Sequence, residues 1–228
     1  MTVWGFIFTC FSVPTSLFGI YELLKKGVIR WKRHKVKSII WDNSSDWVIV
    51  TPQYDEKYRR VEDIIASEKL YEHCNKLGLH CCIQDDSQAI PPDKNLILIC
   101  GPKANKATRK LYRHFHINIE LTTAPVTIKD DLSGCSYKAE YDPTTHDVTK
   151  DYAILSRYID SDTGRIYVFC MGIHGIGTMG AACVLLDYKL IKYIKSFESF
   201  EAVVSVPVIN NRFSIGPADF IIPPRKLK

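Results

Sequence analysis

The sequence lacks the motifs of several large enzyme classes. Its 228 residues contain no Gly-x-Ser-x-Gly elbow, no His-Glu-x-x-His helix, no kinase signature and no Walker A loop. Each of these motifs fixes a nucleophile, a metal ligand or a phosphate-binding backbone in place, so their absence argues against serine-hydrolase, metalloprotease, kinase and P-loop chemistry. The chain also has no repeat of fixed period and no low-complexity tract, which argues against a solenoid or a disordered protein.

A charge excess is likewise missing over most of the chain. Seven of the 30 Lys and Arg residues fall between Lys25 and Lys37, and the chain beyond Lys37 carries the other 23 against 24 Asp and Glu residues. A protein that binds a nucleic-acid duplex usually spreads a basic stripe over its folded surface. We therefore expect no duplex among the partners of this protein.

The eight cysteines show no paired spacing, and several fall in apolar runs. This pattern favours free thiols in a reducing compartment over a disulfide framework. His73-Cys74 and His80-Cys81-Cys82 form the one cluster of potential metal ligands, but its spacing matches no usual zinc pattern. Ordinary core or surface positions are the alternative for these residues.

An uncharged stretch of nineteen residues, 3–21, precedes the basic cluster. This length is close to the roughly 20 residues that cross a bilayer core, and positive charge on one flank favours the cytoplasmic side. We expect a single-pass membrane anchor at 1–24, a basic juxtamembrane linker at 25–44, lipid contacts through 3–37 and a cytoplasmic body. A first helix packed into the protein's own core is the alternative, and a channel would require a homo-oligomer.

The body, 45–228, alternates apolar runs with helical spacing, which predicts a Rossmann-like α/β fold with a mixed, largely parallel sheet and flanking helices. An antiparallel insertion is expected near 122–160, and Pro223-Pro224 are expected to end regular pairing. The expected strands are 46–51, 79–83, 95–100, 165–171, 202–209 and 220–222, and the expected helices are 58–77, one that opens near Pro102, and 181–194.

Ligands of open α/β sheets bind beyond the carboxyl ends of the strands, and two glycine turns follow expected parallel strands there. The first turn begins at Gly101, and the second contains Gly175-x-Gly177-x-x-Gly180. The second resembles the dinucleotide fingerprint of Rossmann domains, although 206–210 supply no acidic residue for a ribose. Close helix-to-sheet packing by small residues is the alternative. The candidate ligand-binding residues are Gly101, Lys103, Asn105, Gly172, Gly175, Gly177 and Thr178.

The segments Gly-Pro-Lys-Ala-Asn-x-x-Thr-Arg and Gly-Ile-His-Gly-Ile-Gly-Thr are similar to those of Rossmann-like domains in bacterial conflict and signalling systems. That resemblance implies a nucleotide-sensing module joined to an effector or a membrane segment. It implies no catalytic residues and identifies no cofactor.

Two functions follow from these residues. The first is a membrane-anchored sensor or signalling module that binds a nucleotide-like or other anionic small molecule. The second is a hydrolase acting on a nucleotide or a glycosidic bond, with Asp85 and Asp86 as carboxylates and His174 as an acid or base. A backbone-bonded loop histidine and solvated loop acids are the structural alternatives for these three residues.

Overall fold

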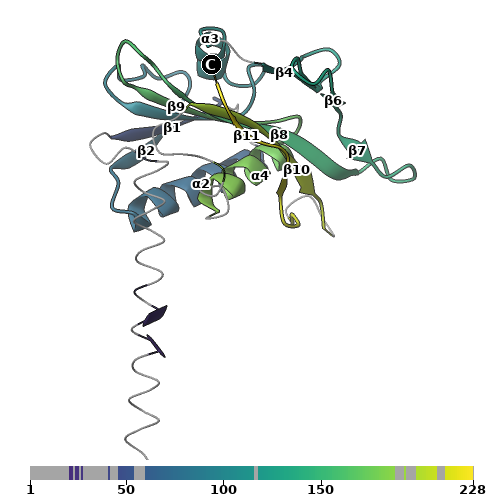
Figure 1. The fold of residues 1–228 in the computed structure, drawn as a ribbon, viewed down its shortest axis with the longest axis horizontal. Coiled ribbons are helices and arrows are strands. Elements are labelled where there is room, and N and C mark those ends of the chain that lie inside the picture. Colours follow the sequence, from purple (N-terminus) through teal and green to yellow (C-terminus); the bar gives the residue numbers. More distant parts are fainter. Residues whose placement is uncertain are drawn as a thin grey trace, which may run out of the picture.

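The structure is a computed structural model of the chain. It describes residues 21–22, 24–25, 27, 41, 46–53, 60–115, 118–187, 193, 199–209 and 214–227. Within these residues a mixed β-sheet carries helices on both faces (Figure 1). The α/β class expected from the sequence is therefore confirmed.

The main sheet has eight strands, seven of them in the order β11-β10-β8-β9-β3-β1-β2, while β7 pairs with β8 outside this path. The strands β2, β1, β3 and β9 run parallel, whereas β8 runs antiparallel to β9, β10 antiparallel to β8, and β11 antiparallel to β10. The expected largely parallel arrangement thus describes one half of a mixed sheet. The strands are β1 (Trp47–Thr51), β2 (Cys81–Asp85), β3 (Asn95–Ile99), β7 (Glu140–Tyr141), β8 (Val148–Ile159), β9 (Ile166–Gly172), β10 (Phe200–Pro207) and β11 (Asp219–Lys226).

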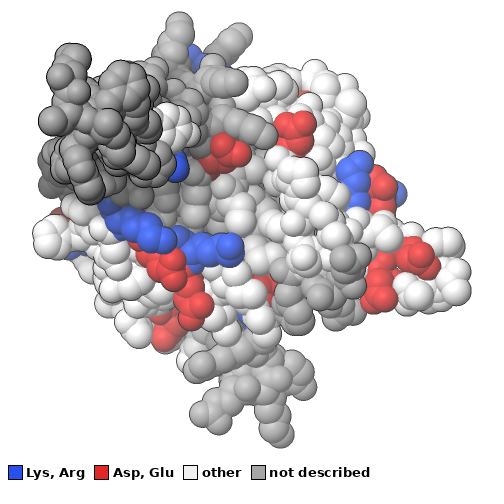
Figure 2. Space-filling view, turned by 90° about the horizontal axis from the view of Figure 1, so that it is seen from below, with Lys and Arg blue, Asp and Glu red and all other residues white. Residues whose placement is uncertain are grey.

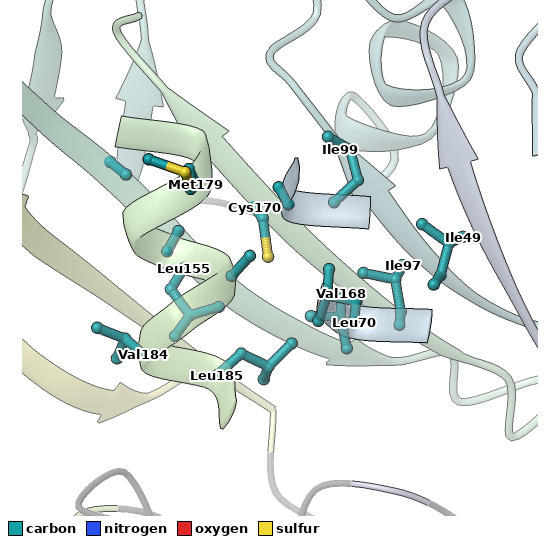
Figure 3. Packing of buried hydrophobic residues seen from close by; sticks show 14 of the residues in the cluster. Ile49, Leu70, Ile97, Ile99, Leu155, Val168, Cys170, Met179, Val184 and Leu185 are labelled. Carbon is teal, nitrogen blue, oxygen red and sulfur yellow. The ribbon is translucent and has the colours of Figure 1, made fainter. Parts of the chain in front are cut away.

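Two layers cover the sheet, one on each face. The helices α2 (Val61–Lys76) and α4 (Gly175–Leu186) pack on one face, through residues such as Leu70 and Leu185 (Figure 3). The other face is covered by α3 (Lys106–Tyr112) and by a small antiparallel sheet of β4 (Ile119–Leu121), β5 (Ile128–Asp130) and β6 (Ser136–Tyr137). Because β3 and β9 are covered on both faces, they are apolar along almost their whole length and fully buried.

Figure 2 views the face that carries α2 and α4. On its described atoms, blue and red side chains lie next to one another rather than in separate fields. A surface of this kind presents no continuous basic stripe in that part of the molecule.

The expected N-terminal anchor and basic linker lie almost entirely outside the described residues. Among the residues that are described, no helix is long and apolar enough to cross a membrane.

Three expected elements differ from the structure. First, β8 belongs to the expected insertion but is a long strand between β9 and β10 in the main sheet. Second, β11 continues through Pro223 and Pro224, because a strand paired on one side only tolerates residues that lack an N–H. Third, α4 begins at Gly175, so the glycines expected in a turn before a helix at 181 are part of the helix itself.

Candidate functional site

The two expected glycine turns meet at one edge of the sheet. Because β3 and β9 are parallel neighbours, the residues that follow them emerge side by side. They enclose a cavity of about 420 Å³, which we call the rim pocket. Its lining is Arg60, Cys100, Gly101, Pro102, Lys103, Ala104, Leu121, Thr122, Thr123, Val126, Gly172, Ile173, His174 and Thr178.

The rim pocket is cationic and partly apolar. Arg60 and Lys103 contribute positive charge, and the described residues of the lining include no Asp or Glu. Apolar wall comes from residues such as Ile173, Leu121 and Val126. A hollow of this size, with an apolar surface and a few charged groups, is typical of a small-molecule site, and its charge favours an anion.

Five of the ten predicted site residues lie in this pocket, namely Gly101, Lys103, Gly172, His174 and Thr178. Sequence reasoning missed Arg60, Thr122 and Thr123. Arg60 precedes α2, and the two threonines follow β4 in the small sheet. The rule that identified the glycine turns selects residues directly after a parallel strand, whereas Arg60 lies at the far end of the connection from β1 to α2 and the threonines follow a strand of the small sheet.

The amino end of α4 is already occupied by a side chain of the protein. The Asp151 carboxylate, from β8, accepts hydrogen bonds from the backbone N–H groups of His174 (3.0 Å), Gly177 (2.6 Å) and Tyr152 (2.9 Å). Burial raises the pKa of Asp151 to about 7, while these N–H donors act in the opposite direction. Asp151 thus takes up two of the N–H groups at this helix end, those of His174 and Gly177, that the dinucleotide fingerprint would present to an external phosphate.

The glycines of this segment provide close packing. A Cβ atom on Gly172 would lie 2.2 Å from the His174 carbonyl oxygen, and one on Gly177 would lie 2.6 Å from the Tyr152 carbonyl oxygen. A Cβ atom on Gly175 would lie 3.0 Å from the Cβ of Glu62. These contacts support the packing alternative for the Gly-x-Gly-x-x-Gly pattern, and they place Gly175 and Gly177 against protein atoms.

Gly180 offers a direct test of that packing role. A Cβ atom there would lie 2.2 Å from a methyl carbon of Val206 on β10. We expect Gly180→Ala to lower the free energy of unfolding by about 1–3 kcal/mol through overpacking, despite the better helix propensity of alanine. Urea denaturation should also show that Val206→Ala rescues much of this loss in the double variant. Additive effects of the two substitutions would contradict the contact.

Asn105 and Asp86 hold α3 in place beside the rim pocket. The Asn105 amide donates to the carbonyls of Val50 (3.1 Å) and Ile99 (2.9 Å) and accepts from Thr108 N–H (3.0 Å). The Asp86 carboxylate accepts from the N–H groups of Gln53 (2.8 Å) and Lys106 (2.5 Å). Both predicted site residues thus have their polar groups engaged within the protein.

The predicted catalytic residues are not gathered in one cavity. Asp85 bonds within its own turn, to Ser87 N–H (2.9 Å) and Gln88 Nε2 (3.1 Å), and lines a separate hollow beside β1 and α2. A hydrogen bond from the Ser87 hydroxyl, together with these turn contacts, holds the pKa of Asp85 below its ordinary value. His174 instead contacts the Tyr141 hydroxyl through Nε2 (2.7 Å). Neither carboxylate therefore lines the pocket that contains His174.

The described cysteines are all free thiols, and the part of the chain that the structure describes contains no group of three or more His, Cys, Asp or Glu side chains that could hold a metal ion. Cys81 lies against Cys74 of α2, and this contact and burial raise its pKa. Within this cluster Cys74 and Cys81 thus belong to the packing between β2 and α2, whereas His80 and Cys82 are exposed.

Comparison with protein-family models found no match, and comparison with curated proteins found none either.

Proposed function

We propose that the protein binds an anionic, nucleotide-like small molecule in the rim pocket and serves as a sensor or signalling module. The observation that carries this proposal is a cavity beyond the neighbouring carboxyl ends of the parallel strands β3 and β9. Among the described residues, its lining contains two cations and no carboxylate. Its volume of about 420 Å³ suits a ligand of nucleotide size. We also propose that the uncharged N-terminal segment tethers this module to a membrane, on the strength of its sequence alone.

Binding would rely on side chains rather than on the α4 amides. Asp151 occupies that helix end, so phosphate charge would be balanced by Lys103 and Arg60 at the pocket wall. The base or another apolar group would contact Ile173 and Leu121. The hydrolase alternative has less support, because Asp85 and Asp86 are separated from the pocket that contains His174.

Replacing Lys103 tests the proposal. We expect Lys103→Ala to weaken the binding of a nucleoside monophosphate about tenfold or more, because a charge-assisted hydrogen bond contributes roughly 1.5–3 kcal/mol. Isothermal titration of the full-length chain with AMP, GMP, CMP and UMP as probes would measure this change. Lys110→Ala is the matched control, since Lys110 is an exposed lysine on α3 outside the lining. The proposal is wrong if none of the four probes binds, or if Lys103→Ala binds as the unmodified protein does.

A further inference from the structure

A second cationic hollow adjoins the rim pocket. It has a volume of about 590 Å³ and shares Pro102, Lys103, Leu121, Thr122 and Thr123 with the first lining. We call it the arginine pocket, because Arg109 and Arg113 are among its remaining residues, together with Tyr112 and Glu120. The two hollows therefore adjoin at five shared residues, which include Lys103, and we refer to them together as the trough.

Among the described residues, no acidic side chain forms an ion pair with the positive charges along this trough. Arg60, Lys103, Arg109 and Arg113 face a single carboxylate in the combined lining, that of Glu120. Among the described residues, none of these four cations makes an ion pair. Unpaired cations grouped along one hollow create a local positive potential that favours a ligand with several negative charges.

Parts of the trough are fixed before any ligand arrives. The Arg109 Nε–H donates to the Pro102 carbonyl (2.9 Å), which holds the guanidinium over the turn that follows β3. Elsewhere in the lining of the trough, the Thr122 hydroxyl accepts a hydrogen bond from Thr127 N–H (3.0 Å) and contacts the Thr127 hydroxyl (2.8 Å). Because these side chains are already held in place, binding a ligand costs less conformational entropy. A planar guanidinium can also donate two parallel hydrogen bonds to phosphate oxygens.

The two ends of the trough differ in chemistry. The rim pocket contributes apolar residues such as Ile173, Val126 and Ala104, which suit a base or another flat apolar group. The arginine pocket contributes two further cations, Arg109 and Arg113, which do not belong to the lining of the rim pocket. A single phosphate beside the base would meet Lys103 and Arg60 but would leave Arg109 and Arg113 without an anionic partner.

From this division, which rests on the proposed nucleotide-binding function, we infer that the ligand is a nucleoside di- or triphosphate. Its base lies in the rim pocket, and its phosphate chain passes Lys103 and ends between Arg109 and Arg113. The arginine pocket thus discriminates between ligands by their number of phosphates, whereas the rim pocket binds the nucleoside.

Calorimetric titration of the full-length chain tests this inference, with the mono-, di- and triphosphates of the four common ribonucleosides as probes. We expect the di- or triphosphate of the preferred base to bind at least tenfold more tightly than its monophosphate. In Arg113→Ala and in the Arg109→Ala/Arg113→Ala double variant, we expect this advantage to fall below threefold, measured in each variant as the ratio of its di- or triphosphate affinity to its own monophosphate affinity. Lys110→Ala, which removes an α3 cation outside both linings, should keep the full advantage.

The outcomes separate the two proposals. Equal affinity for mono- and diphosphates in the unmodified protein overturns the inference and leaves the nucleotide site standing. An advantage that survives in the double variant also overturns it, because the additional phosphates must then lie elsewhere. Absence of binding by every probe overturns both. Within the described residues the Arg113 side chain makes no hydrogen bond and is exposed, so Arg113→Ala should leave the melting temperature unchanged and report on binding alone.

Discussion

Replacing Arg225 with methionine is expected to lower the free energy of unfolding by about 3–5 kcal/mol, because it leaves two buried carboxylates without their cation. The Arg225 guanidinium, on β11, donates to Glu201 through Nε (2.8 Å) and to Asp130 through both terminal nitrogens, one of them at 3.0 Å. The side chains of Asp130 and Glu201 are 1% and 0% exposed. Urea denaturation at neutral pH measures the loss.

Controls distinguish a buried ion pair from a general effect of the substitution. Lys129→Met removes an exposed cation next to Asp130 on β5 and should change the free energy of unfolding by no more than about 0.5 kcal/mol. Adding Asp130→Asn to Arg225→Met should recover part of the loss, since one uncompensated charge is removed. A loss below about 1 kcal/mol in the single variant would mean that water solvates the two carboxylates.

The same cluster contributes to acid stability. The Arg225 guanidinium holds the pKa of Asp130 at about 2, below its ordinary value of 3.8. The folded protein therefore binds this proton less tightly than the unfolded chain does. Its contribution to stability is present above about pH 4 and is lost as the pH falls toward 2.

The second large effect is a pH dependence of the opposite sign, centred on Asp151. Burial raises its pKa from 3.8 to about 7, so the folded protein binds this proton more tightly than the unfolded chain does. The resulting contribution is complete below about pH 4 and is lost as the pH rises through 7. Between pH 5 and pH 8 the expected decrease in the free energy of unfolding is roughly 2–3 kcal/mol.

Asp151→Asn should remove this decrease, because an amide does not ionise and keeps an oxygen that can accept from the amino end of α4. Urea denaturation of both proteins at pH 5, 6, 7 and 8 isolates the effect, since other titrating groups such as His174 are common to both. The difference between the two curves should change with pH across this range. Parallel curves would show that Asp151 stays ionised throughout, held so by its three N–H donors.

The parallel half of the sheet follows closely from sequence. The apolar runs predicted at 95–100 and 165–171 are β3 and β9, and the helical spacing predicted over 58–77 is α2. Strands buried on both faces must be apolar at nearly every position. In an amphipathic helix, apolar residues must recur once per helical turn. Both patterns are therefore easy to recognise in the sequence. The position of the rim pocket could also be predicted from the sequence, because neighbouring parallel strands bring the residues that follow them to the same edge of the sheet.

The antiparallel half and the detailed roles of residues were decided by tertiary structure. In sequence, β8 alternates like a peripheral strand, yet it runs beside β9 at the centre of the sheet. From there Asp151 reaches Gly177, 26 positions along the chain, and caps α4. No local pattern specifies which carboxylate will meet which helix.

The sequence by itself determined the class of fold, the parallel strands and the edge of the sheet at which the two glycine-containing segments meet, since these depend on short-range periodicity and on strand direction. Only the tertiary structure decided that the glycines of α4 serve packing, that Asp151 occupies the helix end, and that Lys103 joins two cationic hollows. The physical reason is that backbone hydrogen bonds and burial depend on contacts between residues far apart in the chain, and such contacts form only when all the layers pack together.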